Sequence, residues 1–180
     1  MEALYAIDLN NGLSKNGIIH WKSKTDMAFF INKTKNNIVI MGKNTFFSIP
    51  KEHRPLKNRL NIVLTSKPNI YENKDENVLF TNNSNIHQVI LNNKNNYCEM
   101  YEFLNKDFKI FFIGGKTIYN QYIPLCETIW ITNIKHNYNC DLFMDYDYSK
   151  QFTEELYKED DELKIIKYTR IYKFTSLQFY

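Results

Sequence analysis

The sequence predicts an α/β fold: a single domain whose mixed, mostly parallel central sheet of about eight strands has helices on both faces and ends in an antiparallel hairpin. Short continuous apolar runs, typical of strands buried on both faces, alternate with segments of helical periodicity. Two longer β-rich runs within residues 152–179, separated by the acidic turn 159–162, indicate the hairpin. The length of 180 residues suits one domain with a full core, so we expect residues 1–180 to form one unit.

In the first half of the chain, a short buried strand at residues 4–7 precedes a polar loop at residues 10–24. A helix is expected over residues 26–34, because Met27, Phe30 and Ile31 recur on one face and Ser23 or Thr25 can cap its start. Buried strands are expected at residues 38–41, 61–64 and 78–80. A short helix that begins at Thr45 lies between the first two of these strands.

The second half continues the alternation. A helix is expected at residues 86–91, a buried strand at 109–113, a helix at 117–122 and a strand at 128–134. Residues 92–107 have the weakest pattern, and the asparagine-rich run 92–96 is predicted to be a solvated loop.

Composition and charge exclude several classes of protein. The net charge of +3 is small and diffuse, whereas nucleic-acid-binding proteins usually carry a concentrated basic stripe. Cys98, Cys126 and Cys140 have no CxxC spacing and complete no zinc set, so we expect free thiols in a reducing compartment and no metal site. There is no secretion signal, and no apolar run approaches the ~20 residues that span a bilayer. We expect a soluble, cytoplasmic monomer that requires neither nucleic acid nor a membrane.

At three places the residue types and their neighbours in the sequence indicate a possible binding or catalytic role. Asp26 opens an apolar helix after Trp21, where it either complements the helix dipole or grips a flat heterocycle through paired hydrogen bonds. Arg59 lies between a turn and a buried strand, as a surface residue or as a bidentate carboxylate ligand. Gly114 and Gly115 follow a buried strand, either as an ordinary tight turn or where backbone approaches a pyrophosphate. They do not form the GxGxxG fingerprint.

Small residues and hydroxyls also stand where two parallel strands are expected to end. Gly42 ends the strand at residues 38–41, and Thr65 and Ser66 end the strand at residues 61–64. Open α/β sheets bind nucleotides at such carboxyl ends.

Several segments resemble the dihydrofolate reductase family. Residues 41–50 read MGKNTFFSIP, residues 55–66 read PLKNRLNIVLTS and residues 113–119 read IGGKTIY, in the same order as the family's matching segments. The loop 12–21 and the spacing from Trp21 to Asp26 extend the resemblance, which covers almost the whole chain.

The resemblance implies NADPH-dependent reduction of 7,8-dihydrofolate to 5,6,7,8-tetrahydrofolate, in support of one-carbon metabolism and thymidylate synthesis. Hydride would pass from nicotinamide C4 to pterin C6, and water would deliver a proton to N5. Dihydrofolate and antifolate inhibitors would be the partners. Because the chain ends just after the expected last strand, we expect a free-standing enzyme rather than a fusion with thymidylate synthase.

The resemblance also implies roles for individual residues. The catalytic group would be Asp26, which orients the ring, with Trp21 and with Thr132, which hydrogen-bonds the carboxylate. The substrate would be bound by Leu4, Met27, Phe30, Ile49, Leu56, Arg59, Ile113 and Tyr119. The cofactor would be bound by Ala6, Leu13, Ser14, Gly17, Gly42, Lys43, Asn44, Thr45, Leu64, Thr65, Ser66, Gly114, Gly115, Lys116, Thr117, Ile118 and Tyr119. The family joins its two glycines by a cis peptide bond.

The chain departs from the family pattern at several positions. Ser14 replaces a glycine, which matters if that position needs a positive φ, and His20 replaces the proline before Trp21. Ser66 stands where some members have arginine, so Lys43 or Lys67 would supply the charge for the 2′-phosphate. Phe46 replaces a tryptophan, and Leu142 follows Asp141 where threonine is common.

Two alternatives remain at this stage. The pyrimidine reductases of riboflavin synthesis share the architecture, but Arg59 and the spacing from Trp21 to Asp26 favour folate. A non-catalytic folate-binding or RNA-binding relative would also account for the basic, asparagine-rich surface.

Overall fold

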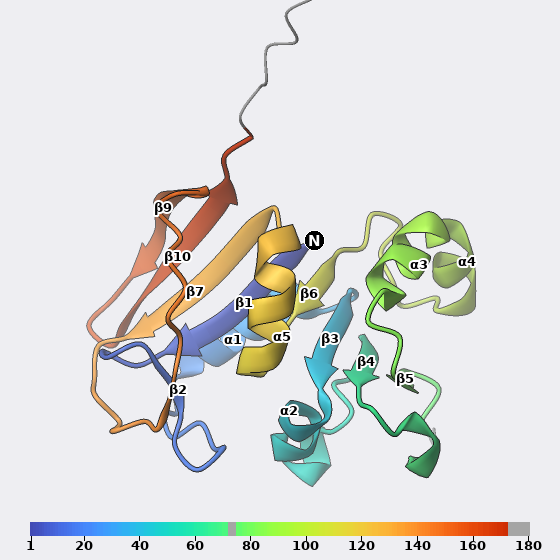
Figure 1. Cartoon of the computed structure of the whole chain (residues 1–180), viewed down its shortest axis with the longest axis horizontal. Coiled ribbons are helices and arrows are strands. Elements are labelled where there is room, and N and C mark those ends of the chain that lie inside the picture. The colour runs from blue at the N-terminus through green and yellow to red at the C-terminus, as the bar shows by residue number, and fades with distance from the viewer. Residues whose placement is uncertain (72–74, 173–180) are drawn as a thin grey trace, which may run out of the picture.

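The computed structural model describes residues 1–71 and 75–172, and its centre is an eight-stranded sheet with the order β5-β4-β3-β6-β1-β7-β10-β9 (Figure 1). The strands are β1 (Glu2–Ile7), β3 (Ile38–Gly42), β4 (Leu60–Leu64), β5 (Val78–Thr81), β6 (Ile110–Phe112), β7 (Thr128–Ile134), β9 (Phe152–Glu159) and β10 (Leu163–Arg170). Strands β1 and β3 to β7 run parallel, whereas β10 is antiparallel to both β7 and β9. The predicted fold class is confirmed. Residues 173–179 of the predicted hairpin lie outside the described residues.

Helices cover both faces of this sheet, with α5 in front of it and α1 behind it in Figure 1. The α-helices are α1 (Lys24–Thr34), α2 (Lys43–Ser48), α3 (Ile86–Asn92), α4 (Lys94–Met100) and α5 (Lys116–Tyr122). Within residues 1–71 and 75–172 there are also three 3-10 turns: η1 (Lys51–His53), η2 (Pro68–Ile70) and η3 (Ile123–Leu125). No helix in the described part of the chain is long and apolar enough to cross a membrane.

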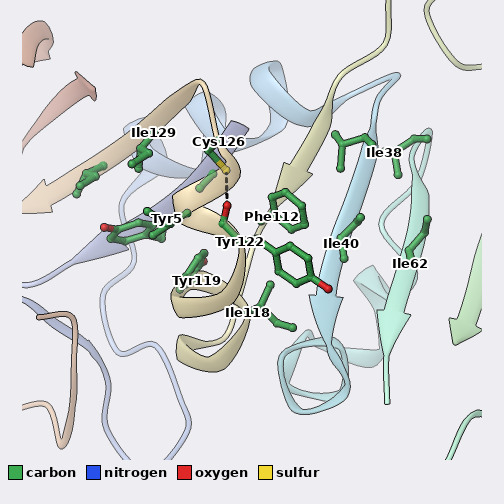
Figure 2. Packing of buried hydrophobic residues seen from close by; sticks show 14 of the residues in the cluster. Tyr5, Ile38, Ile40, Ile62, Phe112, Ile118, Tyr119, Tyr122, Cys126 and Ile129 are labelled. Carbon is green, nitrogen blue, oxygen red and sulfur yellow. Dashed lines mark hydrogen bonds between the residues drawn. The ribbon is translucent and has the colours of Figure 1, made fainter. Parts of the chain in front are cut away.

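Alternation along the strands divides the core into two layers. In β3, Ile38 and Ile40 belong to one layer and Val39 to the other, and all three are fully buried. A strand buried on both faces must be apolar throughout, which explains the continuous run in the sequence. The first layer lies under α5, where the ring of Tyr122 stacks on Phe112 at 4.3 Å between centroids (Figure 2). Each such buried side chain contributes roughly 1.5–3 kcal/mol to the stability of the fold.

Helix α1 packs one aromatic side chain deep into the core and leaves other apolar side chains exposed. Ser23 caps the helix, since its hydroxyl accepts a hydrogen bond of 3.3 Å from the Asp26 N–H. Phe29, however, is the buried aromatic residue and packs on Trp130 at 5.5 Å, whereas Met27 and Ile31 are 56% and 42% exposed. The spacing of Met27, Phe30 and Ile31 predicted the helix correctly, although Phe30 is only partly buried and the other two are largely exposed.

Tertiary contacts changed three local predictions. The asparagine-rich run was predicted to be a loop but leads into α4, where Tyr97 and Cys98 pack against the core and supply the stability that asparagine lacks in a helix. The polar loop at residues 10–24 contains a short strand, β2 (Gly12–Ser14), paired antiparallel with β8 (Leu142–Phe143). Helix α2 begins at Lys43, two residues before the predicted start.

Candidate active site

The strands β1 and β6 separate at their carboxyl ends, and the candidate active site lies at this separation. They pair over only two residue pairs, Glu2 with Phe111 and Ala3 with Phe112, whereas β1 pairs with β7 along its whole length. Beyond the last pair, the Leu4 carbonyl accepts a hydrogen bond of 3.2 Å from the Tyr119 hydroxyl. A split in strand order at the carboxyl end of a parallel sheet is where α/β folds bind ligands.

Asp26 lies in the first turn of α1, at the edge of this separation. Burial raises the pKa of its carboxyl, and the nearby Thr132 hydroxyl opposes part of that rise by hydrogen bonding to the charged form. Thr132 is 1% exposed, and its oxygen has no partner of ordinary hydrogen-bond geometry among the described residues. The two groups are neighbours without a hydrogen bond of ordinary geometry. A half-buried carboxyl beside an unsatisfied hydroxyl is the arrangement that a polar ligand would complete.

Tyr119 lies close both to Gly114 and to Asp26. Burial raises the pKa of the Tyr119 hydroxyl, and the charge of Asp26 raises it further. The expected cis peptide bond between Gly114 and Gly115 is present. Gly114 has a φ of +119°, and a Cβ there would lie 3.0 Å from the Tyr119 hydroxyl oxygen. A Cβ on Gly115 would lie 3.3 Å from Thr45 Oγ1, so both positions need the close backbone approach that glycine allows.

Arg59 is 5% exposed at the start of β4 and has no acidic partner among the described residues. Its Nε donates to Thr34 Oγ1 at 2.8 Å, Nη1 donates to the Lys57 carbonyl at 2.7 Å and Nη2 donates to the Ile31 carbonyl at 3.4 Å. A guanidinium has five N–H donors. These bonds therefore leave one N–H on each terminal nitrogen, which matches the two oxygens of a carboxylate.

Two buried residues that the sequence reasoning missed hold Arg59 in place. Thr34 donates to the Phe30 carbonyl at 2.7 Å while it accepts from Arg59. Asn61 is fully buried, accepts from the Leu56 N–H at 3.0 Å and donates to the carbonyls of Leu56 and Arg59. A fully buried Asn inside an apolar strand was the signal available in the sequence, because such an amide must be hydrogen-bonded.

The strand ends predicted to hold the cofactor lie side by side. Gly42 is level with Leu64 in the β3–β4 pairing, and its N–H donates to the Gly114 carbonyl at 2.7 Å. Lys43, Asn44, Ser66 and Lys67 are exposed beyond these ends, and Thr65 is partly exposed. Ile118 packs beside Gly42, whose Cβ would lie 3.5 Å from it. Lys116 forms an ion pair of 3.5 Å with Asp145, and Thr117 is exposed.

The predicted substrate residues are distributed around the same region. Leu4 and Ile113 are buried in the second core layer, where Ala6, Phe30, Ile49 and Leu56 are partly buried. Met27 is more than half exposed on α1, so the fold itself does not hold its side chain against the core. Their contacts with a ligand stay predictions.

The segment 10–20, which we call the lid segment, contains β2 and is paired through it with β8. Leu13 and Ser14 are each 8% exposed, and Trp21 packs its ring at 5.6 Å from that of Tyr138. Ser14 is not among the residues with a positive φ, so the replacement of glycine there requires no shifted backbone, whereas Gly17 has a φ of +75°. His20 is an exposed loop residue as expected.

Comparison with known proteins identifies the family. The family model for dihydrofolate reductase matches residues 1–175. The chain belongs to the dihydrofolate reductase family. It is 34% identical over 149 residues to dihydrofolate reductase of Ureaplasma parvum, which spans 83% of this chain and 84% of that relative.

Further relatives place this dihydrofolate reductase family member in context. The bifunctional dihydrofolate reductase-thymidylate synthase of Daucus carota is 36% identical over 152 residues, which are 79% of this chain but 28% of that longer protein. Among solved structures, Enterococcus faecalis dihydrofolate reductase in complex with NADP(H) and RAB-propyl aligns with a TM-score of 0.70 and 25% identity, over 94% of this chain and 95% of that one.

Proposed function

We infer that this chain catalyses the NADPH-dependent reduction of 7,8-dihydrofolate to 5,6,7,8-tetrahydrofolate. The observation that carries the inference is the pair of groups on either side of the β1–β6 separation. The Tyr119 hydroxyl lies close to Asp26, a half-buried carboxyl with a raised pKa, and also close to the first of the paired glycines. Family membership adds the substrate and the cofactor to this geometry.

The residues fit a reduced dinucleotide. A Cβ would be crowded at both Gly114 and Gly115, by Tyr119 and Thr45, and the absence of side chains would let a planar ring approach this backbone closely. Lys43 stands beyond β3 and Ser66 and Lys67 beyond β4, where they would bind the 2′-phosphate of NADPH. Lysine acts there as a point charge, because residues 65–71 directly after β4 contain no arginine. When bound, NADPH supplies the hydride.

The remaining work belongs to the chain's own residues. Asp26 accepts hydrogen bonds from the pterin ring and holds its orientation, and it favours the protonated, more electrophilic imine. Thr132 orients the Asp26 carboxylate. Arg59 binds a carboxylate of the substrate's glutamate through its two unused N–H groups. Most of the rate acceleration comes from holding the two reactants in the correct orientation between β1 and β6.

We further propose that the protein works as a cytoplasmic monomer. Cys98, Cys126 and Cys140 form no disulfide, which suits a reducing compartment. Light scattering after gel filtration measures the mass of the particle, and a mass of twice 21.6 kDa at micromolar concentration would contradict the monomer.

Loss of NADPH absorbance with and without dihydrofolate tests the function. We expect dihydrofolate-dependent oxidation, with tetrahydrofolate identified by mass, and no oxidation with the ribityl-pyrimidine substrate of riboflavin synthesis. Oxidation that requires the pyrimidine would support the alternative reductase. Folate binding with no oxidation in either reaction would support a non-catalytic relative.

A further inference from the structure

Asp8 directly follows β1. It is a buried carboxylate that has no role in the proposed mechanism or in the sequence motifs. It is 1% exposed, and the described part of the chain gives it no cationic partner. Oδ1 accepts from the N–H groups of Asn10 at 2.9 Å and Gly12 at 2.8 Å. Oδ2 accepts from the N–H of Tyr138 at 3.0 Å. One side chain thus joins two segments that are 130 residues apart.

The ionisation of Asp8 follows from these bonds. Burial alone would raise its pKa, but the three backbone donors and the thiol of Cys140 together lower it. Burial and the neighbouring Asp8 raise the pKa of the Cys140 thiol to about 11, so the thiol keeps its proton at neutral pH and can donate. Asp8 is therefore a charged acceptor at neutral pH, and its charge is balanced by N–H groups.

The two segments that Asp8 joins also contact each other through hydrogen bonds. One is the lid segment, and the other is the segment 136–143 that follows β7, which carries Thr132. Leu9 N–H donates to the His136 carbonyl at 3.1 Å, and Asp141 N–H donates to the Ser14 carbonyl at 3.0 Å. Asn16 N–H also donates to Asp141 Oδ2 at 2.8 Å. Asp8 lies at the β1 end of this set of contacts between the two segments.

Gly12 packs very closely against Cys140 and Asp8. A Cβ on Gly12 would lie 2.3 Å from Cys140 Cβ and 2.8 Å from Asp8 Oδ1. No side chain fits between the lid segment and residue 140 at this point. The lid segment therefore packs closely against the segment 136–143 at this point, beside the Asp8 carboxylate.

We propose that Asp8 is a positioning residue that locks the lid segment to the segment 136–143 and so holds Leu13 and Ser14 over the cofactor. This proposal rests on the reductase function inferred above. Asp8 touches neither reactant, and it acts through the backbone of both segments.

The variants Asp8→Asn and Asp8→Ala separate its two roles. Asn keeps one oxygen for Asn10 and Gly12 but turns an N–H group toward the Tyr138 N–H, so it breaks the link between the segments while the lid turn persists. Ala removes both. Asp147→Asn is the matched control, because that carboxylate also accepts from a backbone N–H, of Ser149 at 3.1 Å, in an exposed loop.

Hydrogen–deuterium exchange and single-turnover kinetics with NADPH-loaded enzyme are the measurements. In Asp8→Asn we expect faster exchange at residues 12–17 and 138–141, and hydride transfer slowed by about 10-fold with the KM for dihydrofolate within about threefold of wild type. Asp8→Ala should be slower still, by up to about 100-fold. The control should match wild type in both measurements.

Unchanged exchange in Asp8→Asn would overturn the proposal. So would a loss of rate that only equals the fraction unfolded, measured by circular dichroism at the same temperature. If wild type itself reduces no dihydrofolate, the proposed function fails, but exchange still decides whether Asp8 locks the two segments.

Discussion

Replacing Arg59 with lysine tests the substrate end of the site. In the structure, three of the guanidinium donors bind Thr34 Oγ1 and two carbonyls, and one N–H remains on each terminal nitrogen. Lysine keeps the charge but cannot hold these partners and a carboxylate in one plane. If each hydrogen bond to a charged group contributes about 1.5–3 kcal/mol, loss of one carboxylate bond weakens binding by about 12- to 140-fold.

The assay compares two substrates. Arg59→Lys should lower kcat/KM for dihydrofolate by about 100-fold, mainly through KM. With 7,8-dihydropteroate, which lacks the glutamate, the same variant should stay within about threefold of wild type. The pterin end of the site would then be intact, and the loss would belong to the carboxylate alone.

Arg170→Lys is the matched control for stability. Arg170 also donates to backbone carbonyls, of Ile123, Pro124 and Cys126, at the end of β10. Both variants should lose about 1–3 kcal/mol in urea unfolding, but Arg170→Lys should leave both substrates unaffected. Equal losses on dihydrofolate and dihydropteroate in Arg59→Lys would refute the reasoning and leave Arg59 a structural residue.

Further predictions concern the catalytic end and the core. Asp26→Asn should lower turnover at neutral pH by about 100-fold or more and recover partly in acid; a wild-type rate at neutral pH would remove Asp26 from the mechanism. Because burial raises the pKa of Asp26, its ionised form destabilises the fold above that raised pKa. The ligand-free Asn variant should therefore melt higher than wild type at neutral pH, and the difference should vanish as pH falls through the raised pKa to the ordinary carboxyl value. Thr132→Val removes a group that lowers this pKa, so the pH profile of hydride transfer should move to higher pH; a shift the other way would contradict the pairing. Gly114→Ala should cost about 1–3 kcal/mol and weaken the thermal shift produced by NADPH, since φ is +119° and a Cβ would lie 3.0 Å from the Tyr119 hydroxyl oxygen. Phe112→Ala should cost about 3–5 kcal/mol in urea unfolding because the ring is fully buried, and a loss below about 1 kcal/mol would contradict that packing.

Local patterns in the sequence predicted the strands and helices that are regular. The apolar run in β3 and the glycines after β6 are patterns of only a few residues. A buried strand and a tight turn can therefore be predicted from them without knowledge of the fold. Helix α4 could not be predicted in this way, because its stability comes from Tyr97 and Cys98 packing on distant parts of the core. The same holds for β2, which exists through its pairing with β8.

The sequence by itself determined the α/β class, the family and which side chains have the chemistry for the reaction, because motifs of short range encode them. The tertiary structure alone decided how those side chains are used. It showed that Arg59 has two donors left over, that Thr132 is unsatisfied beside Asp26, and that Asp8 joins two segments 130 residues apart. Hydrogen bonds and burial depend on which distant residues meet, and that information exists only once the chain has folded.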